Sequence, residues 1–321
     1  MSTPTKQPGL LRTTLAQRVV VADGAMGTML QAANPTLEDF QNHEGCNEIL
    51  NVSRPDIVRS VHNEYLAAGV DAVETNTFGA NWSNLADYGI EDRIYELAFA
   101  GGKIARDAAD SFSTKDKPRF VLGSLGPGTK LPSLGHTTYE NLKVAYYTAA
   151  KGLSDSGCDA LLVETSQDLL QVKAAVNGCR QAINEADRDI MLIAQVTVET
   201  TGTMLLGSEI GAALNTLEPM GIDLIGLNCA TGPTEMSEHL RYLSKNAKIA
   251  ISVMPNAGLP VLGANGASYP LGPLELATAL EGFVADYGIS LVGGCCGTTP
   301  AHLAAVVQQV SGKRFMEDHR N

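Results

Sequence analysis

The sequence predicts a (β/α)₈ (TIM) barrel that forms a single α/β domain. Three observations support this prediction: eight short aliphatic runs, amphipathic helical stretches between them, and a length of 321 residues. The aliphatic runs are mostly continuous rather than alternating, which suits parallel strands that are covered on both faces. Eight β-then-α units in roughly 300 residues match such a barrel in count and length.

The predicted strands follow one another at intervals that leave room for a helix after each. They are Val19–Ala22, Ala72–Glu74, Phe120–Gly123, Ala160–Val163, Met191–Val196, Leu224–Leu227, Ile249–Val253 and Ser290–Val292. Two helices carry clear end signals. Pro55 suits a first helical turn and Gly69 suits the end of the same helix, while Thr299, followed by Pro300, suits the N-cap of the last helix.

The competing fold is a doubly wound open sheet. It would need a nucleotide fingerprint, and no glycine-rich run reads Gly-x-Gly-x-x-Gly. No linker divides the chain, so we expect one barrel over residues 19–310, an N-terminal extension over 1–18, and a tail or linker stub over 311–321. Residues 258–273 contain three prolines and four glycines, and we expect them to form a long loop after the seventh strand.

Composition narrows the classes of partner. The net charge of −12 argues against nucleic acid or an anionic membrane surface. Residues 1–11 are polar and do not resemble a signal peptide, and no run of about 18 apolar residues could span a bilayer. We therefore expect a cytoplasmic protein without a membrane partner. In that reducing setting, cysteines are more often ligands or nucleophiles than disulfide partners.

Three of the six cysteines follow predicted strands. Cys229 comes after the sixth strand, and Cys295 and Cys296 lie between glycines after the eighth. Barrel enzymes place their chemistry at the carboxyl ends of the strands, and glycines allow the sharp turn that would aim two adjacent thiols at one ion. The sequence therefore predicts an open zinc site with three thiolates and a free fourth position. The alternatives are cysteines buried for packing, and a redox pair, which lacks the usual Cys-x-x-Cys spacing.

Three thiolates on zinc favour sulfur alkylation over hydrolysis, because they leave little Lewis acidity to activate water, whereas a substrate thiol in the fourth position would lose its proton. Asp23 and Glu164 follow the first and fourth strands and could hold the ammonium group of an amino acid. Backbone N–H groups of Gly24, Ala25 and their neighbours could hold its carboxylate. The alternatives are a carboxylate pair for sugar hydrolysis, salt bridges at the rim, and a phosphate cradle at residues 293–297.

Five motifs together resemble a known family, the homocysteine-binding (homocysteine S-methyltransferase) domain of cobalamin-dependent methionine synthase. The resemblance extends from about Val19 to Val310. The motifs are Asp23-Gly-Ala-Met-Gly-Thr28, Gly45-Cys-Asn-Glu-Ile-Leu-Asn51, Glu74-Thr-Asn-Thr-Phe-Gly79, Met254-Pro-Asn-Ala-Gly258 and Gly293-Gly-Cys-Cys-Gly-Thr-Thr-Pro300.

The resemblance implies a zinc-bearing barrel that activates L-homocysteine for methylation to methionine. Cys229, Cys295 and Cys296 match the family's zinc ligands, which also act in catalysis. The substrate-binding positions are matched by Asp23, Thr75 and Glu164. Asn256 matches a residue near the zinc that can ligate it when homocysteine is absent.

The implied methyl donor is methylcobalamin, because the motif at residues 45–51 is more typical of the cobalamin-dependent branch than of relatives that use betaine or S-methylmethionine. The full enzyme continues into further modules, including one for cobalamin. We expect this chain to be either one such module or a stand-alone protein that meets a separate cobalamin-binding protein. The open alternatives are a methyltransferase that uses S-methylmethionine or betaine, a non-catalytic thiol- or metal-binding module, and a phosphate-binding lyase.

Overall fold

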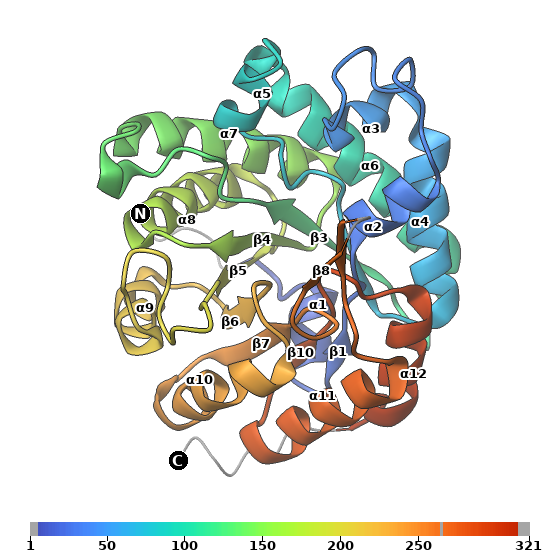
Figure 1. The fold of residues 1–321 in the computed structure, drawn as a ribbon, viewed down its shortest axis with the longest axis vertical. Helices are drawn as coiled ribbons and strands as arrows, with labels where there is room; N and C mark the ends of the chain where they lie inside the picture. Colours follow the sequence, from blue (N-terminus) through green and yellow to red (C-terminus); the bar gives the residue numbers. More distant parts are fainter. Residues whose placement is uncertain (1–5, 264–265, 314–321) are drawn as a thin grey trace.

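The protein is a barrel of eight parallel strands surrounded by helices, as the computed structural model shows (Figure 1). The structure describes residues 6–263 and 266–313. The barrel strands are β1 (Val20–Val21), β2 (Ala72–Glu74), β3 (Phe120–Leu125), β4 (Ala160–Ser166), β5 (Met191–Val196), β6 (Leu224–Asn228), β7 (Ala250–Met254) and β10 (Leu291–Val292). The predicted (β/α)₈ barrel is confirmed, and the competing open sheet is wrong.

Helices alternate with these strands along the chain and cover the outside of the barrel (Figure 1). They are α1 (Leu10–Leu15), α2 (Met26–Ala32), α3 (Leu50–Ser53), α4 (Pro55–Ala68), α5 (Trp82–Ala86), α6 (Ile94–Phe112), α7 (Tyr139–Ser156), α8 (Leu169–Glu185), α9 (Ile210–Leu217), α10 (Pro233–Asn246), α11 (Pro273–Tyr287) and α12 (Pro300–Val310). Within the described ranges, none of them is long and apolar enough to cross a membrane.

The predicted helix ends are confirmed at α4 and α12. Pro55 opens α4, and Gly69 ends it with a φ of 101°, a left-handed conformation that glycine adopts without a Cβ penalty. Pro300 opens α12 after Thr299, whose backbone N–H donates to Nδ1 of His302 at 3.2 Å. The sequence therefore encodes both helices through local end signals.

The barrel closes between β1 and β2 mainly through two aspartate side chains. The sheet order is β1-β10-β7-β6-β5-β4-β3-β2, so β1 and β2 share no strand ladder. Instead, Asp71 Oδ2 accepts the N–H of Val21 at 3.0 Å, and Asp23 Oδ1 accepts the N–H of Glu74 at 3.0 Å. One backbone bond also joins the strands, from Asp71 N to Val21 O at 2.7 Å. Asp23 therefore holds the barrel wall together as well as standing at its mouth.

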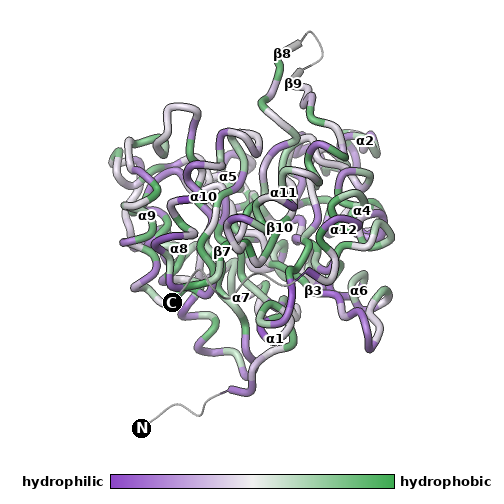
Figure 2. Tube along the Cα trace, turned by 90° about the horizontal axis from the view of Figure 1, so that it is seen from below, coloured by the Kyte–Doolittle hydropathy of each residue, from purple (hydrophilic) through white to green (hydrophobic). Residues whose placement is uncertain are grey.

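A helix from the predicted N-terminal extension packs against the lower end of the barrel. Leu11 and Leu15 of α1 belong to the same apolar cluster as the inward-facing residues of the strands. Arg12 of α1 reaches Asp189 at 2.8 Å and Asp223 at 2.6 Å. Figure 2 shows α1 at the end of the barrel opposite to β8 and β9. The candidate site therefore lies at the end of the barrel opposite to α1, where β8 and β9 project.

The expectation of a loop over residues 258–273 is corrected by the structure. This segment contains β8 (Val261–Gly263) and β9 (Gly266–Ser268), which pair antiparallel and project from the mouth of the barrel (Figure 2). Strands of three residues are too short to produce a periodic sequence signal, and the glycines and prolines around them favoured a loop. Of the predicted tail, only residues 311–313 are described, and Lys313 O accepts the N–H of Val19 at 3.1 Å.

Candidate metal and substrate site

The three predicted cysteine ligands converge at the mouth of the barrel. Their sulfur atoms all lie within 4.8 Å of one another, and Cys229 Sγ is 3.9 Å from Cys296 Sγ. A tetrahedral zinc ion with Zn–S bonds of about 2.3 Å separates its sulfur ligands by roughly 3.8 Å. The described part of the chain contains no other cluster of three or more such side chains at this spacing. The cluster therefore fits a zinc ion.

The backbone around Cys229 adopts a conformation that brings its sulfur to the other two. Cys229 has a φ of 59° and Ala230 a φ of 58°, and both are left-handed values that residues with a Cβ adopt at a cost of roughly 1–3 kcal/mol each. A hydrogen bond from Cys229 N to Met254 O at 3.2 Å anchors this turn to the end of β7. Strain of this kind persists where the surrounding structure enforces it, often at functional sites.

Glycines let the chain turn at Cys295 and Cys296. Gly297 has a φ of 77°, and a Cβ there would lie 2.3 Å from the ring of Tyr269. A Cβ on Gly294 would lie 2.4 Å from the hydroxyl of Thr298. The vicinal cysteines therefore depend on glycine on both sides, as the sequence predicted.

The turn is a poor phosphate cradle, because four of its five N–H groups already donate to other acceptors in the protein. Gly293 N, Gly294 N and Cys295 N donate to the carbonyls of Val253, Asp23 and Pro255 at 3.1, 2.9 and 2.8 Å. Cys296 N donates to the side-chain oxygen of Asn256 at 3.1 Å. Anion binding at a glycine-rich turn needs free N–H groups aimed at the ligand. These contacts disfavour the phosphate alternative and show that Asn256 holds the Cys296 turn.

The three thiols are electrostatically linked. Hydrogen bonds from Cys229 and Cys295 lower the pKa of Cys296 to about 3. The pKa of Cys295 is raised well above its usual range, because its hydrogen bonds to Cys229 and Cys296 favour the protonated thiol. The protonation of each thiol therefore depends on the other two. A bound cation would take the place of the thiol protons as the partner of the sulfur atoms.

A cavity of about 250 Å³ adjoins the sulfur cluster. This is smaller than the roughly 300–1,000 Å³ of pockets that enclose drug-sized ligands, and it suits a small amino acid. Among the described residues, three glutamates and no basic side chain line it. Its lining is Gly24, Ala25, Met26, Gly27, Thr28, Asn47, Glu48, Glu74, Thr75, Asn76, Phe78, Ser124, Glu164, Thr165, Cys229, Gly294, Cys295 and Cys296.

Glu164 of β4 is held at the cavity by two hydrogen bonds, one from β3 and one from β6. Its Oε1 accepts from the Ser124 hydroxyl at 2.5 Å, and its Oε2 accepts from Asn228 Nδ2 at 3.0 Å. Burial raises the pKa of Glu164 to about 7, although the bond from Ser124 limits the rise. Burial also raises the pKa of Asp23 well above its usual range. A nearby cation would stabilise the ionised form of carboxyl groups whose pKa is raised by burial.

The other predicted substrate residues lie in or just behind the cavity wall. Gly24, Ala25 and Thr75 line the cavity, whereas Asp23 and Asn256 do not. The Thr75 hydroxyl lies 2.6 Å from that of Thr77 and accepts the N–H of Ser124 at 3.0 Å, so it joins β2 to β3. The Ala25 N–H makes a long bond of 3.3 Å to the Thr298 hydroxyl.

Three polar residues at the ends of strands received no role from the sequence reasoning, although they lie at the cavity or bond its carboxyl group: Glu74, Ser124 and Asn228. Side chains alternate along a strand, and Ala72, Leu122 and Leu224 point into the barrel interior. Glu74, Ser124 and Asn228 lie two or four residues beyond them, so they share that inward face at the top of the barrel. Extending the alternation through the carboxyl end of each strand would have found all three.

The segment at residues 45–51 braces the exit of β2. Asn51 Nδ2 donates to Asn76 O at 2.8 Å, and Asn76 Nδ2 donates to Asn47 O at 2.8 Å. Glu48 Oε1 accepts the N–H of Gly79 at 2.7 Å. These three hydrogen bonds fix the chain on both sides of the exit of β2. They therefore hold residues 74–78, which form part of the cavity wall, in place.

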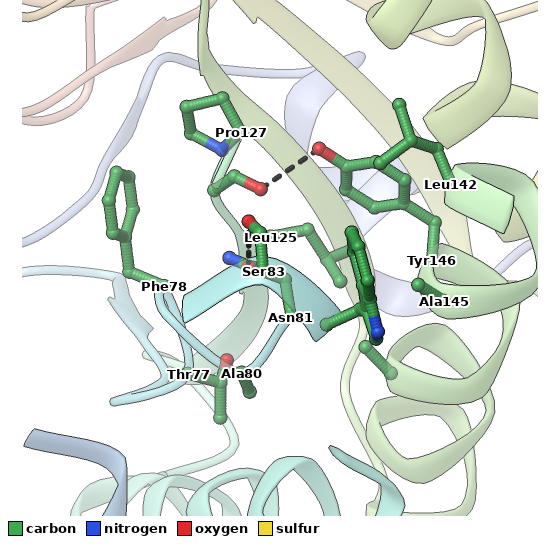
Figure 3. Close-up of a pocket in the computed structure, with 13 residues that line it drawn as sticks. Thr77, Phe78, Ala80, Asn81, Ser83, Leu125, Pro127, Leu142, Ala145 and Tyr146 are labelled. Atoms are coloured by element: carbon green, nitrogen blue, oxygen red, sulfur yellow. Dashed lines mark hydrogen bonds between the residues drawn. The ribbon is translucent and has the colours of Figure 1, made fainter. Parts of the chain in front are cut away.

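Behind that wall, the exits of β2 and β3 pack around a much smaller cavity (Figure 3). Its volume is about 10 Å³, enough for about one water molecule. The Tyr146 hydroxyl donates to Gly126 O at 3.0 Å, and the Ser83 hydroxyl donates to Asn81 Oδ1 at 3.1 Å. Phe78 lines both cavities.

The fold and the site together define a barrel protein with three cysteine thiols at its mouth, spaced so that they could hold a metal ion, beside a cavity lined by carboxyl groups. The chain belongs to the homocysteine S-methyltransferase family, whose model matches residues 20–310. This membership confirms the resemblance drawn from the sequence motifs.

Two of the most similar relatives are named methionine synthase. The chain is 65% identical to that of Mycobacterium tuberculosis over 297 residues, which is 92% of this chain and 25% of the relative. It is 64% identical to that of Mycobacterium leprae over 298 residues, which is 93% of this chain and 25% of the relative. The chain thus spans about a quarter of the length of these relatives.

A solved structure shares the fold. The metallated form of the homocysteine methyltransferase MmuM from Escherichia coli superimposes with a TM-score of 0.74 at 24% sequence identity. The match covers 92% of this chain and 98% of that one. At this identity the likeness concerns the architecture.

Proposed function

We propose that this protein binds L-homocysteine and activates its thiol for S-methylation to methionine, with Cys229, Cys295 and Cys296 holding a zinc ion. The observation that carries the proposal is the convergence of three sulfur atoms beside a cavity of amino-acid size that is lined by carboxyl groups. Family membership and the similarity to enzymes named methionine synthase support it.

Zinc bound to the three thiolates would supply the positive charge that keeps a substrate thiol ionised at neutral pH. The protein supplies the positioning. Asn256 fixes the turn that carries Cys296, and the strained turn at Cys229 fixes the third sulfur. A pre-ionised and positioned nucleophile lowers the barrier of a transfer reaction without a further catalytic base.

The cavity walls suit the two charged ends of an amino acid. Glu164 presents a carboxyl group for the substrate ammonium. Thr75, which lines the cavity, and Asp23, which lies behind the cavity wall, support this ammonium-binding side. The turn at Gly24 and Ala25 leads into α2, whose first backbone N–H groups have no partner inside the helix. Those N–H groups suit the substrate carboxylate.

Methylcobalamin, held by another module or by a separate cobalamin-binding protein, is the methyl donor in this proposal. A corrinoid is several times larger than the cavity, so such a donor would approach from the open mouth. The branch resemblance of the motif at residues 45–51 favours it over betaine and S-methylmethionine. Free thiols at the site suit a cytoplasmic setting.

The test is a donor panel on the zinc-loaded protein with L-homocysteine. We expect methionine from methylcobalamin, and none from Cys295→Ser, which would also lose zinc. Cys179→Ala is the matched control, because Cys179 is buried in the helical layer and lies outside the sulfur cluster. Methionine formation by metal-free Cys295→Ser would refute the proposal. Turnover with betaine or S-methylmethionine alone would refute the donor assignment, and binding without turnover would support a thiol-binding module.

A further inference from the structure

Three carboxyl groups meet at the top of the barrel, and two of them are already engaged by the protein. Glu164 accepts hydrogen bonds on both oxygens, from Ser124 and Asn228. Asp23 accepts the N–H of Glu74 and does not line the cavity. The third carboxyl group is that of Glu74, and within the residues that the structure describes it is not engaged in this way.

Glu74 lines the cavity with a free acceptor. Its Oε1 atom is buried and has no hydrogen-bond partner among the described residues. Buried polar atoms in folded proteins are nearly always paired, so an unpaired carboxyl oxygen calls for a donor from outside the chain. The strand places it there, because Glu74 follows the inward-facing Ala72 by two residues.

The charge around Glu74 specifies the kind of donor. No lysine, arginine or histidine lines the cavity in the described structure, and Glu164 and Asp23 both lie close enough to repel a negative charge on Glu74. Burial, with these two neighbours, raises the pKa of Glu74 well above its usual range. A ligand that brings a positive charge and several N–H donors would relieve this repulsion and fill the free acceptor.

We propose that Glu74 is a second acceptor for the ammonium group of the substrate, beside Glu164. This inference rests on the proposed function, because it assumes an amino-acid substrate. It adds a binding residue that neither the sequence motifs nor the resemblance assigned to the substrate.

The consequence is a loss of affinity confined to ligands that carry an amine. A hydrogen bond to a charged group is worth about tenfold to a hundredfold in affinity. We expect Glu74→Gln to weaken L-homocysteine binding by that factor. The same variant should leave the binding of 4-sulfanylbutanoate within about twofold of wild type, because this analogue keeps the thiol and carboxylate but lacks the amine.

Glu48 offers a matched control, because it lines the same cavity but has partners for its oxygens. Its Oε1 accepts the N–H of Gly79 at 2.7 Å, and its Oε2 lies 3.8 Å from Cys46 Sγ. Glu48→Gln should therefore change the affinity for both ligands by the same factor, which is the pattern of a structural role.

The experiment is isothermal titration calorimetry of the zinc-loaded full chain with both ligands, on wild type, Glu74→Gln, Glu74→Asp and Glu48→Gln. Selective loss of L-homocysteine affinity in Glu74→Gln supports the inference, and an intermediate selective loss in Glu74→Asp supports it if the glutamine variant fails to fold. An equal loss for both ligands, or no loss, overturns it while the proposed function stands. Failure of the wild type to bind L-homocysteine overturns both.

Discussion

Replacing Ser124 with alanine removes one of the two hydrogen bonds that hold the Glu164 carboxylate. The Ser124 hydroxyl lies 2.5 Å from Glu164 Oε1, and both side chains are buried. Burial raises the pKa of Glu164 to about 7, and this hydrogen bond restrains the rise. A hydrogen bond to a charged group contributes roughly 1.5–3 kcal/mol, and about 1.4 kcal/mol corresponds to one pKa unit. We therefore expect the variant to raise the pKa of Glu164 by about one to two further units.

The sign of the effect on binding follows from the charge of Glu164. Glu164 attracts an ammonium group only as a carboxylate, so the part of the amino-acid affinity that Glu164 contributes is present above its pKa and is lost as the pH falls through that pKa. L-2-Aminobutanoate carries the ammonium and carboxylate groups but no thiol, so its binding reports on the cavity without thiol ionisation. Calorimetric titration across the neutral range should place the midpoint of affinity about one to two pH units higher in Ser124→Ala than in wild type.

Ser252→Ala is the control for this comparison. Ser252 lies in the same barrel interior, but its hydroxyl accepts from Gln195 Nε2 at 3.0 Å rather than donating to Glu164. We expect this variant to keep the wild-type midpoint. An unchanged midpoint in Ser124→Ala would refute the reasoning that this hydrogen bond sets the charge of Glu164.

Three further predictions concern stability, measured by urea unfolding. His62 is fully buried, neither ring nitrogen has a partner among the described residues, and burial lowers its pKa to about 3. The same histidine takes up a proton near pH 6.5 in the unfolded chain, so protonation between pH 7 and pH 5 favours unfolding. Over this range the wild type should lose about 2 kcal/mol of unfolding free energy that His62→Leu does not lose. Leu11→Ala should lower the free energy of unfolding by about 2–5 kcal/mol, because Leu11 packs in the barrel interior. A change near zero would show that α1 contributes little to stability. Gly226→Ala should lower the free energy of unfolding by about 3 kcal/mol, because the Cβ of the alanine would lie 2.2 Å from the carbonyl oxygen of Ser252. An unchanged free energy of unfolding would contradict that contact.

The fold could be predicted because each strand of a closed parallel barrel is buried on both faces and is therefore continuously aliphatic in sequence. Observed strand bounds differ from the predicted ones by three residues at most, with the largest difference at the carboxyl end of β4. The role of α1 could not be predicted, since a six-residue helix carries little periodic signal and its partners lie far along the chain. The β8–β9 pair was missed for a similar reason.

The sulfur site could be predicted because three thiols at two strand ends are an unusual use of cysteine in a barrel. The polar residues around the cavity were harder to find. β3, β4 and β6 all continue beyond their predicted ends, so Ser124 and Asn228 fell outside the strands we expected. Asp23 was predicted as a substrate residue, and no sequence pattern indicated that its side chain closes the gap between β1 and β2. Contacts between distant segments decide such roles.

X-ray absorption at the zinc edge of the metal-loaded protein tests the central claim most directly. With Cys229, Cys295 and Cys296 as ligands, we predict three sulfur neighbours at about 2.3 Å, rising to four when L-homocysteine is added. A spectrum dominated by nitrogen or oxygen neighbours, or a sulfur count that does not change with L-homocysteine, would contradict the account.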